Sequence, residues 1–130
     1  MDNKVKIFIL DDEEEALYLL KKVLTIRGFE VEVSPDSRVA FERIKKFNPC
    51  LILLDLRMPH LGGFEFCEML NKDAQTQRIP IIIISVFVDE ADIKRAYQLG
   101  AGGYVKKPFT LDQLLREIDK VIGYKHVQAS

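Results

Sequence analysis

The chain has little cysteine, no excess of either charge and no long apolar run. Cys50 and Cys67 lack the spacing of a metal-binding motif, so we expect reduced thiols packed as small hydrophobic side chains. Lys and Arg total 19 against 20 Asp and Glu, a net charge of -1, which predicts no direct nucleic-acid binding and no attraction to an anionic membrane. Only six mostly apolar residues precede Asp11, too few for a signal peptide or a membrane span. We therefore expect a cytoplasmic protein.

The length of 130 residues is that of one ordinary domain. Apolar residues make up 48% of the chain, enough for a substantial buried core. The last helical pattern ends near Gly123. We therefore predict one domain over residues 1–123 and a polar C-terminal tail over residues 124–130.

Five short apolar segments alternate with helical patterns. The segments are continuous, which is typical of strands buried on both faces of a parallel sheet. They comprise residues 5–10, 31–33, 51–54, 81–84 and 103–105. The apolar residues expected on the buried faces of the five helices are Ala16, Leu19, Leu20, Val23 and Leu24; Ala40, Ile44 and Phe47; Phe66, Met69 and Leu70; Ile93, Ala96 and Tyr97; and Leu111, Leu114, Leu115, Ile118, Val121 and Ile122. Thr110 and Gln113 form a predicted capping box before the last helix.

This alternation predicts an α/β fold. Strand–helix–strand units cross over with a right-handed sense, which gives a parallel sheet with helices on both faces. For five strands, the natural candidate is a flavodoxin-like (βα)5 three-layer sandwich with strand order 2-1-3-4-5. Ligands of such sheets bind beyond the carboxyl ends of the strands, where the strand order reverses.

Carboxylates follow the two strands that flank this point. Asp11 and Asp12 end the first strand, and Asp55 ends the third. Each alone fits another role, since acids favour helix N-termini and turns. Together they would repel one another, so a proton or a cation must join them, and hard oxygen ligands suit Mg²⁺. A carboxylate beside Mg²⁺ can attack phosphorus and form an aspartyl phosphate.

Hydrogen-bonding and cationic groups end the other two strands. Ser85 ends the fourth strand and can donate its hydroxyl to a phosphoryl oxygen. Lys106 and Lys107 end the fifth and can bring an ammonium group to the same cleft. Taken alone, a Ser at a strand end is usually a turn residue and a Lys is usually solvated. A functional site is indicated because both residue types follow strands that end at the same edge of the sheet.

Four motifs resemble the receiver domains of bacterial response regulators over residues of roughly 4 to 123. They are ILDDE at 9–13, LLDLRMP at 53–59 followed by Gly62 and Gly63, IIS at 83–85 and GAGGYVKKPF at 100–109. The resemblance implies that Asp55 is the phosphoacceptor and that Asp12, Asp55 and the carbonyl of Arg57 ligate Mg²⁺, with Asp11 acting through a bound water.

The same resemblance assigns the remaining roles. Ser85 would bind the phosphoryl group, and Lys107, which precedes the proline, would be the site lysine, leaving Lys106 to solvent or a partner. The Lys107–Pro108 bond would be cis. Tyr104 matches the family's switch aromatic, although it could also be an ordinary strand residue.

The implied function is a phosphorelay switch and not an enzyme. A sensor histidine kinase or a His phosphotransfer protein would donate the phosphoryl group. Phosphorylation would then repack the face formed by the fourth helix, fifth strand and fifth helix, which would engage a downstream target, a fused output domain or a second copy as a homodimer.

Two other functions are compatible with parts of the sequence. A phosphatase of the haloacid-dehalogenase kind places a second Asp two residues after its nucleophile, where this chain has Arg57, and no cap domain is visible. A receiver that acts only as an unphosphorylated interaction module would not need the intact acidic residues, Ser85 and Lys107.

One departure from the family is Val86, where Ala or Gly is usual; its branched side chain suggests slower phosphotransfer or slower hydrolysis.

Overall fold

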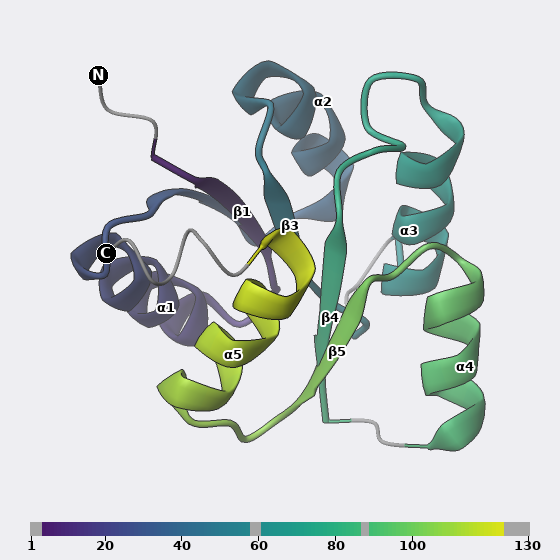
Figure 1. Cartoon of the computed structure of the whole chain (residues 1–130). Coiled ribbons are helices and arrows are strands. Elements are labelled where there is room, and N and C mark those ends of the chain that lie inside the picture. The colour runs from purple at the N-terminus through teal and green to yellow at the C-terminus, as the bar shows by residue number, and fades with distance from the viewer. Residues whose placement is uncertain (1–3, 58–60, 87–88, 124–130) are drawn as a thin grey trace.

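The computed structural model describes residues 4–57, 61–86 and 89–123. Five strands and five helices alternate along this part of the chain (Figure 1). In order they are β1 (Lys6–Leu10), α1 (Glu14–Ile26), β2 (Glu30–Ser34), α2 (Ser37–Phe47), β3 (Leu51–Asp55), α3 (Gly63–Lys72), β4 (Ile81–Ser85), α4 (Glu90–Gln98), β5 (Gly103–Lys106) and α5 (Leu111–Ile122). The predicted tail, residues 124–130, lies outside the described residues.

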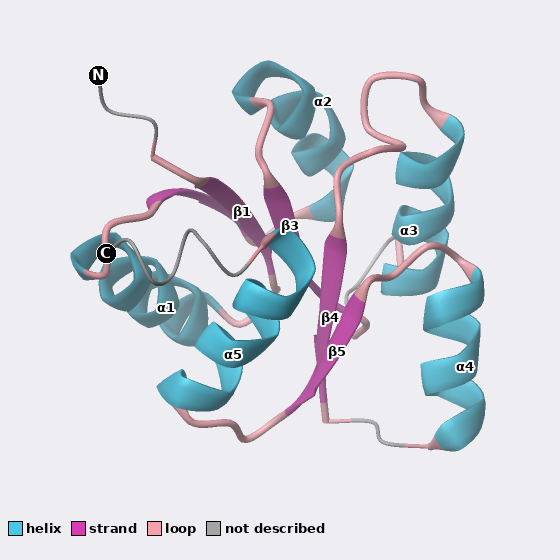
Figure 2. Cartoon of the chain, in the orientation of Figure 1, coloured by secondary structure: helices cyan, strands magenta, loops and turns pink. Residues whose placement is uncertain are grey.

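The strands form one parallel sheet with the order β2-β1-β3-β4-β5. Helices α1 and α5 cover one face, and α2, α3 and α4 cover the other (Figure 2). The flavodoxin-like three-layer fold predicted from the sequence is therefore confirmed. Because β1 and β3 are neighbours, their carboxyl ends lie side by side at the reversal of strand order.

Both faces of the central strands are buried. On β3, Leu51 and Leu53 point into the core beneath α1 and α5, whereas Ile52 and Leu54 point into the core beneath the other three helices. Successive residues of a strand point to opposite faces of the sheet, and here both faces are buried. The strand sequences are therefore continuous apolar runs.

Polar side chains cap the N-termini of α4 and α5. The Thr110 hydroxyl accepts from the backbone N–H of Gln113 at 3.1 Å, and the Gln113 side chain accepts from the Thr110 N–H at 2.9 Å, so the predicted capping box is present. The Asp89 carboxylate accepts from the N–H of Ala91 and begins α4. These bonds fix where α4 and α5 begin, beyond the carboxyl ends of β4 and β5.

Two residues expected on buried helix faces are exposed. Leu19 is 64% exposed and Tyr97 47%, whereas Leu17, which was not predicted, is 1% exposed. On α1, Leu17 and Leu24 lie seven residues apart on the line that faces the sheet, and Leu19 lies on the far side of the helix. A helix with many leucines matches the apolar period on more than one face, so periodicity alone could not identify the buried one.

The cysteines are both free, as expected, but only one is packed. Cys67 is buried and burial raises the pKa of its thiol to about 12, whereas Cys50 is exposed. In the described part of the chain, no helix is long and apolar enough to cross a membrane.

Gly63 is required by a close approach of α3 to the end of β3. A Cβ at this position would lie 2.4 Å from Cα of Leu56 and 2.8 Å from the carbonyl oxygen of Asp55. The N–H of Gly63 donates to the carbonyl of Leu56 at 3.1 Å, which holds the two segments together. The first residue of α3 therefore clamps the backbone that carries Asp55.

We expect Gly63→Ala to lower the free energy of unfolding by about 1–3 kcal/mol, because the added methyl group forces the β3–α3 backbones apart. Intrinsic helix propensity acts in the opposite direction, since Ala is favoured over Gly inside a helix. Urea denaturation measures the change. Gly102→Ala is the matched control, because a Cβ there meets its nearest atom at an ordinary 3.6 Å; equal losses in both variants would contradict the close approach.

Candidate functional site

Three carboxylates gather at the carboxyl ends of β1 and β3. Asp11 and Asp12 directly follow β1, and Asp55 is the last residue of β3. One ligand oxygen from each lies within 4.8 Å of the others. Asp11 and Asp55 are buried, at 7% and 6% exposure, whereas Asp12 is exposed. The edge therefore has an acidic cluster that is partly removed from water and open on the side of Asp12.

Lys107 joins the two buried carboxylates. Its ammonium Nζ lies 2.9 Å from Oδ2 of Asp11 and 3.2 Å from Oδ2 of Asp55. Burial acts to lower the pKa of Lys107, but the hydrogen bond and the charge of Asp11, together with Asp55, outweigh it and raise the pKa. Lys107 is thus held as a cation between two acids that would otherwise repel each other.

The position of Lys107 follows from strand register. Ser85 on β4 pairs with Lys106 on β5, and the N–H of Lys107 donates to the carbonyl of Ser85 at 2.8 Å. The Lys107–Pro108 peptide bond is cis. Successive strand residues point to opposite faces, and of the two lysines it is Lys107 whose ammonium reaches Asp11 and Asp55.

Asp55 is poorly solvated for a carboxylate. Its Oδ1 accepts from the backbone N–H of Arg57 at 3.0 Å. Burial raises the pKa of Asp55 to about 6, and the charge of Asp11 adds to this, while the Arg57 N–H and Lys107 act in the opposite direction. An additional cation beside this carboxylate would stabilise its charged form.

Ser85 and Tyr104 lie next to this cluster on neighbouring strands. Ser85 is fully buried at the end of β4. Burial raises the pKa of the Tyr104 hydroxyl, a hydrogen bond with Ser85 acts against this shift, and the charges of Asp92 and Asp55 add to it. The two hydroxyls are therefore in contact, and Asp55 is close enough for its charge to act on Tyr104.

The structure thus brings together most of the residues singled out in the sequence: Asp11, Asp12, Asp55, Ser85, Tyr104 and Lys107. Arg57 contributes its backbone N–H to Asp55, and its side chain is exposed. Of the LLDLRMP motif, Met58 and Pro59 lie outside the described residues.

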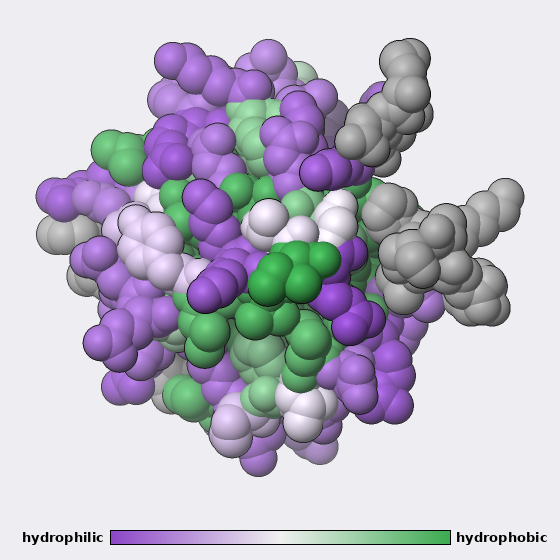
Figure 3. Space-filling model, turned by 90° about the vertical axis from the view of Figure 1, so that its left-hand side faces the viewer, coloured by the Kyte–Doolittle hydropathy of each residue, from purple (hydrophilic) through white to green (hydrophobic). Residues whose placement is uncertain are grey.

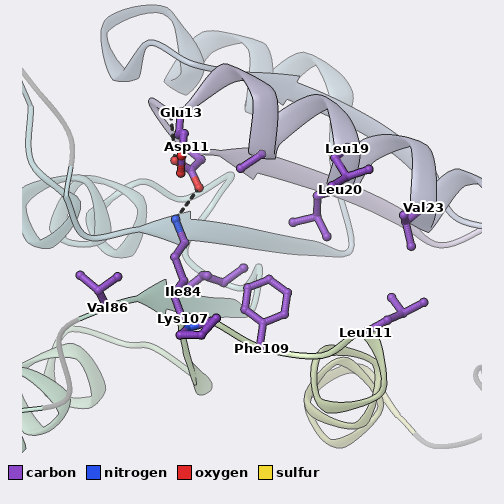
Figure 4. A pocket seen from close by; sticks show the side chains of 12 residues that line it. Asp11, Glu13, Leu19, Leu20, Val23, Ile84, Val86, Lys107, Phe109 and Leu111 are labelled. Atoms are coloured by element: carbon purple, nitrogen blue, oxygen red, sulfur yellow. Dashed lines mark hydrogen bonds and ion pairs between the residues drawn. The ribbon is translucent and has the colours of Figure 1, made fainter.

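An apolar groove beside the acidic cluster was not expected from the sequence. It has a volume of about 520 Å³ and runs between α1 and the segment that joins β5 to α5. Leu19, Leu20 and Val23 of α1 lie across from Phe109 and Leu111, and the Asp11–Lys107 pair closes one end (Figure 4). Leu19, which is exposed on α1, is one of the residues that line this groove. A leucine on the unburied side of a helix is the signal that could have revealed it.

The fold and this edge of the sheet define a class of regulatory domain. The response regulator receiver domain family matches residues 7–119, and the chain belongs to that family. It is therefore a receiver domain of the two-component signalling type, a regulator rather than a classical enzyme.

The relatives that this chain resembles include proteins named as transcriptional regulators. A probable transcriptional regulator ycf27 of Galdieria sulphuraria is 38% identical over 92% of this chain and 50% of that protein. The phosphate regulon transcriptional regulatory protein PhoB of Rhizobium meliloti is 32% identical over 90% of this chain and 52% of that protein. The chain spans about half the length of the curated relatives it matches.

Solved structures with the same fold match most of the chain. The Vibrio cholerae chemotaxis protein CheY4 has a TM-score of 0.86 at 27% identity, covering 91% of this chain and 98% of that one. A CheY-like receiver protein of Methanospirillum hungatei has a TM-score of 0.82 at 25% identity, covering 91% and 93% of the two chains.

Asp55→Asn should change stability in a pH-dependent way when no divalent metal is bound. Because folding raises the pKa of Asp55 from 3.8 to about 6, the carboxyl group favours the folded state when protonated, and this contribution is lost as pH rises between about 4 and 6. At pH 7 the variant should exceed the parent by about 1–3 kcal/mol in unfolding free energy, with the difference vanishing near pH 4. Urea denaturation in a chelator measures both.

Asp73→Asn is the control of opposite sign. Backbone hydrogen bonding from Gln75 lowers the pKa of Asp73, so its carboxylate stabilises the fold at neutral pH and loses that effect on acidification. This variant should be less stable than the parent at pH 7. If Asp55→Asn also lost stability at pH 7, the account of Asp55 as a strained carboxylate would be wrong.

Proposed function

We propose that the chain is a phosphoacceptor receiver of a two-component phosphorelay and accepts a phosphoryl group on Asp55. One observation carries the proposal. Carboxylate oxygens of Asp11, Asp12 and Asp55 lie within 4.8 Å of one another, and Lys107 forms ion pairs with the two buried acids, Asp11 and Asp55. Family membership supports it independently.

The chemistry assigns one task to each side chain. A carboxylate oxygen of Asp55 attacks the phosphorus of a phosphohistidine, the O–P bond forms, the donor's P–N bond breaks, and the imidazole leaves and takes up a proton. Lys107 and the Ser85 hydroxyl lie where they can hold the phosphoryl oxygens. Positioning and charge neutralisation account for most of the catalysis of phosphoryl transfer, so no further nucleophile or base is needed.

The donor set fits Mg²⁺. Receiver domains generally bind this ion, and Asp11, Asp12 and Asp55 offer the hard, negatively charged oxygens that it prefers. Asp12 and Asp55 would be direct ligands together with the carbonyl of Arg57, and Asp11 would act through a water. Bound Mg²⁺ supplies the positive charge that offsets repulsion between the carboxylates and the incoming phosphoryl group.

Ser85 and Tyr104 form the switch in this proposal. Their hydroxyls are hydrogen-bonded, so a phosphoryl group that engages Ser85 changes the partner of Tyr104. Tyr104 lines a second groove, of about 420 Å³, between β5 and α5 with Lys106 and Arg116. A shift of the tyrosine therefore alters the α4–β5–α5 face, which would engage a downstream target, an output domain or a second copy.

The whole of residues 1–123 would act as the receiver unit, with residues 124–130 as its tail. The donor would be a sensor histidine kinase or a His phosphotransfer protein, which places the reaction in the cytoplasm. Neither nucleic acid nor membrane is a partner of this domain in the proposal, since its net charge is only -1.

Incubation with Mg²⁺ and a small phosphodonor such as acetyl phosphate should add one phosphoryl group per chain, because the cluster supplies both nucleophile and charge neutralisation. Intact-mass measurement followed by peptide mapping should place it on Asp55. A chelator should abolish the addition.

Asp55→Asn should gain no mass, while Asp112→Asn, which changes an exposed carboxylate on α5, should be modified like the parent. Phosphorylation of the Asp55→Asn variant to the same extent would refute the assignment of the acceptor.

Val86→Ala should accelerate both phosphotransfer and dephosphorylation several-fold. Val86 is 49% exposed and lines the groove with Asp11, Ile84 and Lys107. In this hypothesis its branched side chain would narrow the approach to Asp55. Release of phosphate from the phosphorylated protein measures the second rate. Val39→Ala is matched for size and exposure, at 51% on α2, and should change nothing; equal rates for parent and Val86→Ala would remove the hypothesis.

A further inference from the structure

Helix α1 carries an exposed stripe with apolar residues in its centre and opposite charges at its ends. The stripe comprises Glu15, Tyr18, Leu19 and Lys22, at positions i, i+3, i+4 and i+7 of one helix face. Tyr18 is 53% exposed and Leu19 64%, which are high values for large apolar side chains. Figure 3 shows apolar side chains gathered in the middle of the side of the molecule on which α1 lies, with hydrophilic ones around them. Within the part of the chain that the structure describes, these two side chains remain open to solvent.

The two charges of the stripe have no ion-pair partner among residues 4–57, 61–86 and 89–123. Glu15 and Lys22 are both exposed, and neither takes part in the salt bridges formed within that part of the chain. They are seven residues apart, about 10 Å along the helix axis, so they cannot pair with each other in one chain. Opposite charges flanking an apolar centre make the stripe complementary to itself when it is turned end to end.

We propose that α1 packs antiparallel against α1 of a second copy of this chain. The two-fold axis would pass between Tyr18 and Leu19, so that these side chains from both copies form the apolar centre. Glu15 of each copy would then meet Lys22 of the other, once on each side of the axis, because the contact is isologous. The charge pattern excludes the parallel arrangement, which would set Glu15 against Glu15 and Lys22 against Lys22.

The shape of the surface around α1 fits the same contact. The stripe lies between two hollows: the groove of about 520 Å³, which Leu19 borders, and a shallower one of about 340 Å³ lined by Tyr18, Lys22 and Ile26. A ridge flanked by grooves is the form in which helices interlock. One helix from each copy is a small contact, so the dimer is weak and forms at high concentration.

The pairing has a consequence that rests on the proposed function. Leu19 forms an edge of the groove whose far end is the Asp11–Lys107 pair, so a second copy on α1 covers the approach to Asp55 from this side. A protein phosphodonor using that approach would compete with the second copy, whereas a small phosphodonor would not.

Sedimentation velocity of the unphosphorylated full chain, without metal, from about 10 µM to about 1 mM tests the pairing. The parent should shift from monomer to dimer across this range. Glu15→Lys and Lys22→Glu should each weaken the dimer about tenfold, because each sets like charges opposite one another in two symmetric places. The variant that carries both changes should regain the parent's dimerisation, since the swap restores both pairs.

Glu14→Lys makes the same charge change one residue earlier, about 100° around the helix from Glu15, and should leave dimerisation unaltered. Circular dichroism confirms folding of each variant. A parent that stays monomeric throughout, a dimer that is insensitive to Glu15→Lys and Lys22→Glu, or a double variant that does not recover overturns the proposal. Because no phosphodonor is present, failure of Asp55 phosphorylation would leave this result unchanged.

Discussion

Repulsion between carboxylates at one edge of the sheet is the constraint on which the remaining features of the site depend. Parallel pairing of β1 with β3 brings Asp11 and Asp55 together with little water around them. Two buried like charges are stable only beside a positive charge or a proton, and the raised pKa of Asp55 reflects both burial and the charge of Asp11. Lys107 supplies part of that compensation from the far end of the chain.

The rest of the domain holds that arrangement in place. Strands β3 and β4 are buried along their whole length, so their register cannot slip without moving apolar residues out of the core. Register then sets Ser85 beside the lysine segment of β5, and Gly63 lets α3 approach the backbone of Asp55. The side chains of the site thus lie on loops and strand ends that a rigid core positions. In the proposed function, a phosphoryl group at this edge would shift the contact between Ser85 and Tyr104.

Helix α1 combines a structural role with a surface role. Leu17 and Leu24 hold it to the sheet, while Leu19 and Tyr18 remain outside, between the hollows that flank the helix. In the two proposals, this one surface would serve both the approach to Asp55 and the contact with a second copy. Large apolar side chains left exposed in a cluster are a reason to expect a partner for this surface.

The amino-acid sequence by itself determined the architecture and most of the site. Continuous apolar strands, helical spacing between them, and polar residues at Asp11, Asp55, Ser85 and Lys107 predict the sheet order and the edge where these groups meet, because parallel strands end together. Only the tertiary structure decided that Leu19 faces out while Leu17 faces in, that an apolar groove adjoins the acids, and that Gly63 touches the backbone beyond β3. These depend on distances between segments far apart in the chain. Local periodicity carries no information about such distances, because several faces of a leucine-rich helix satisfy the same spacing.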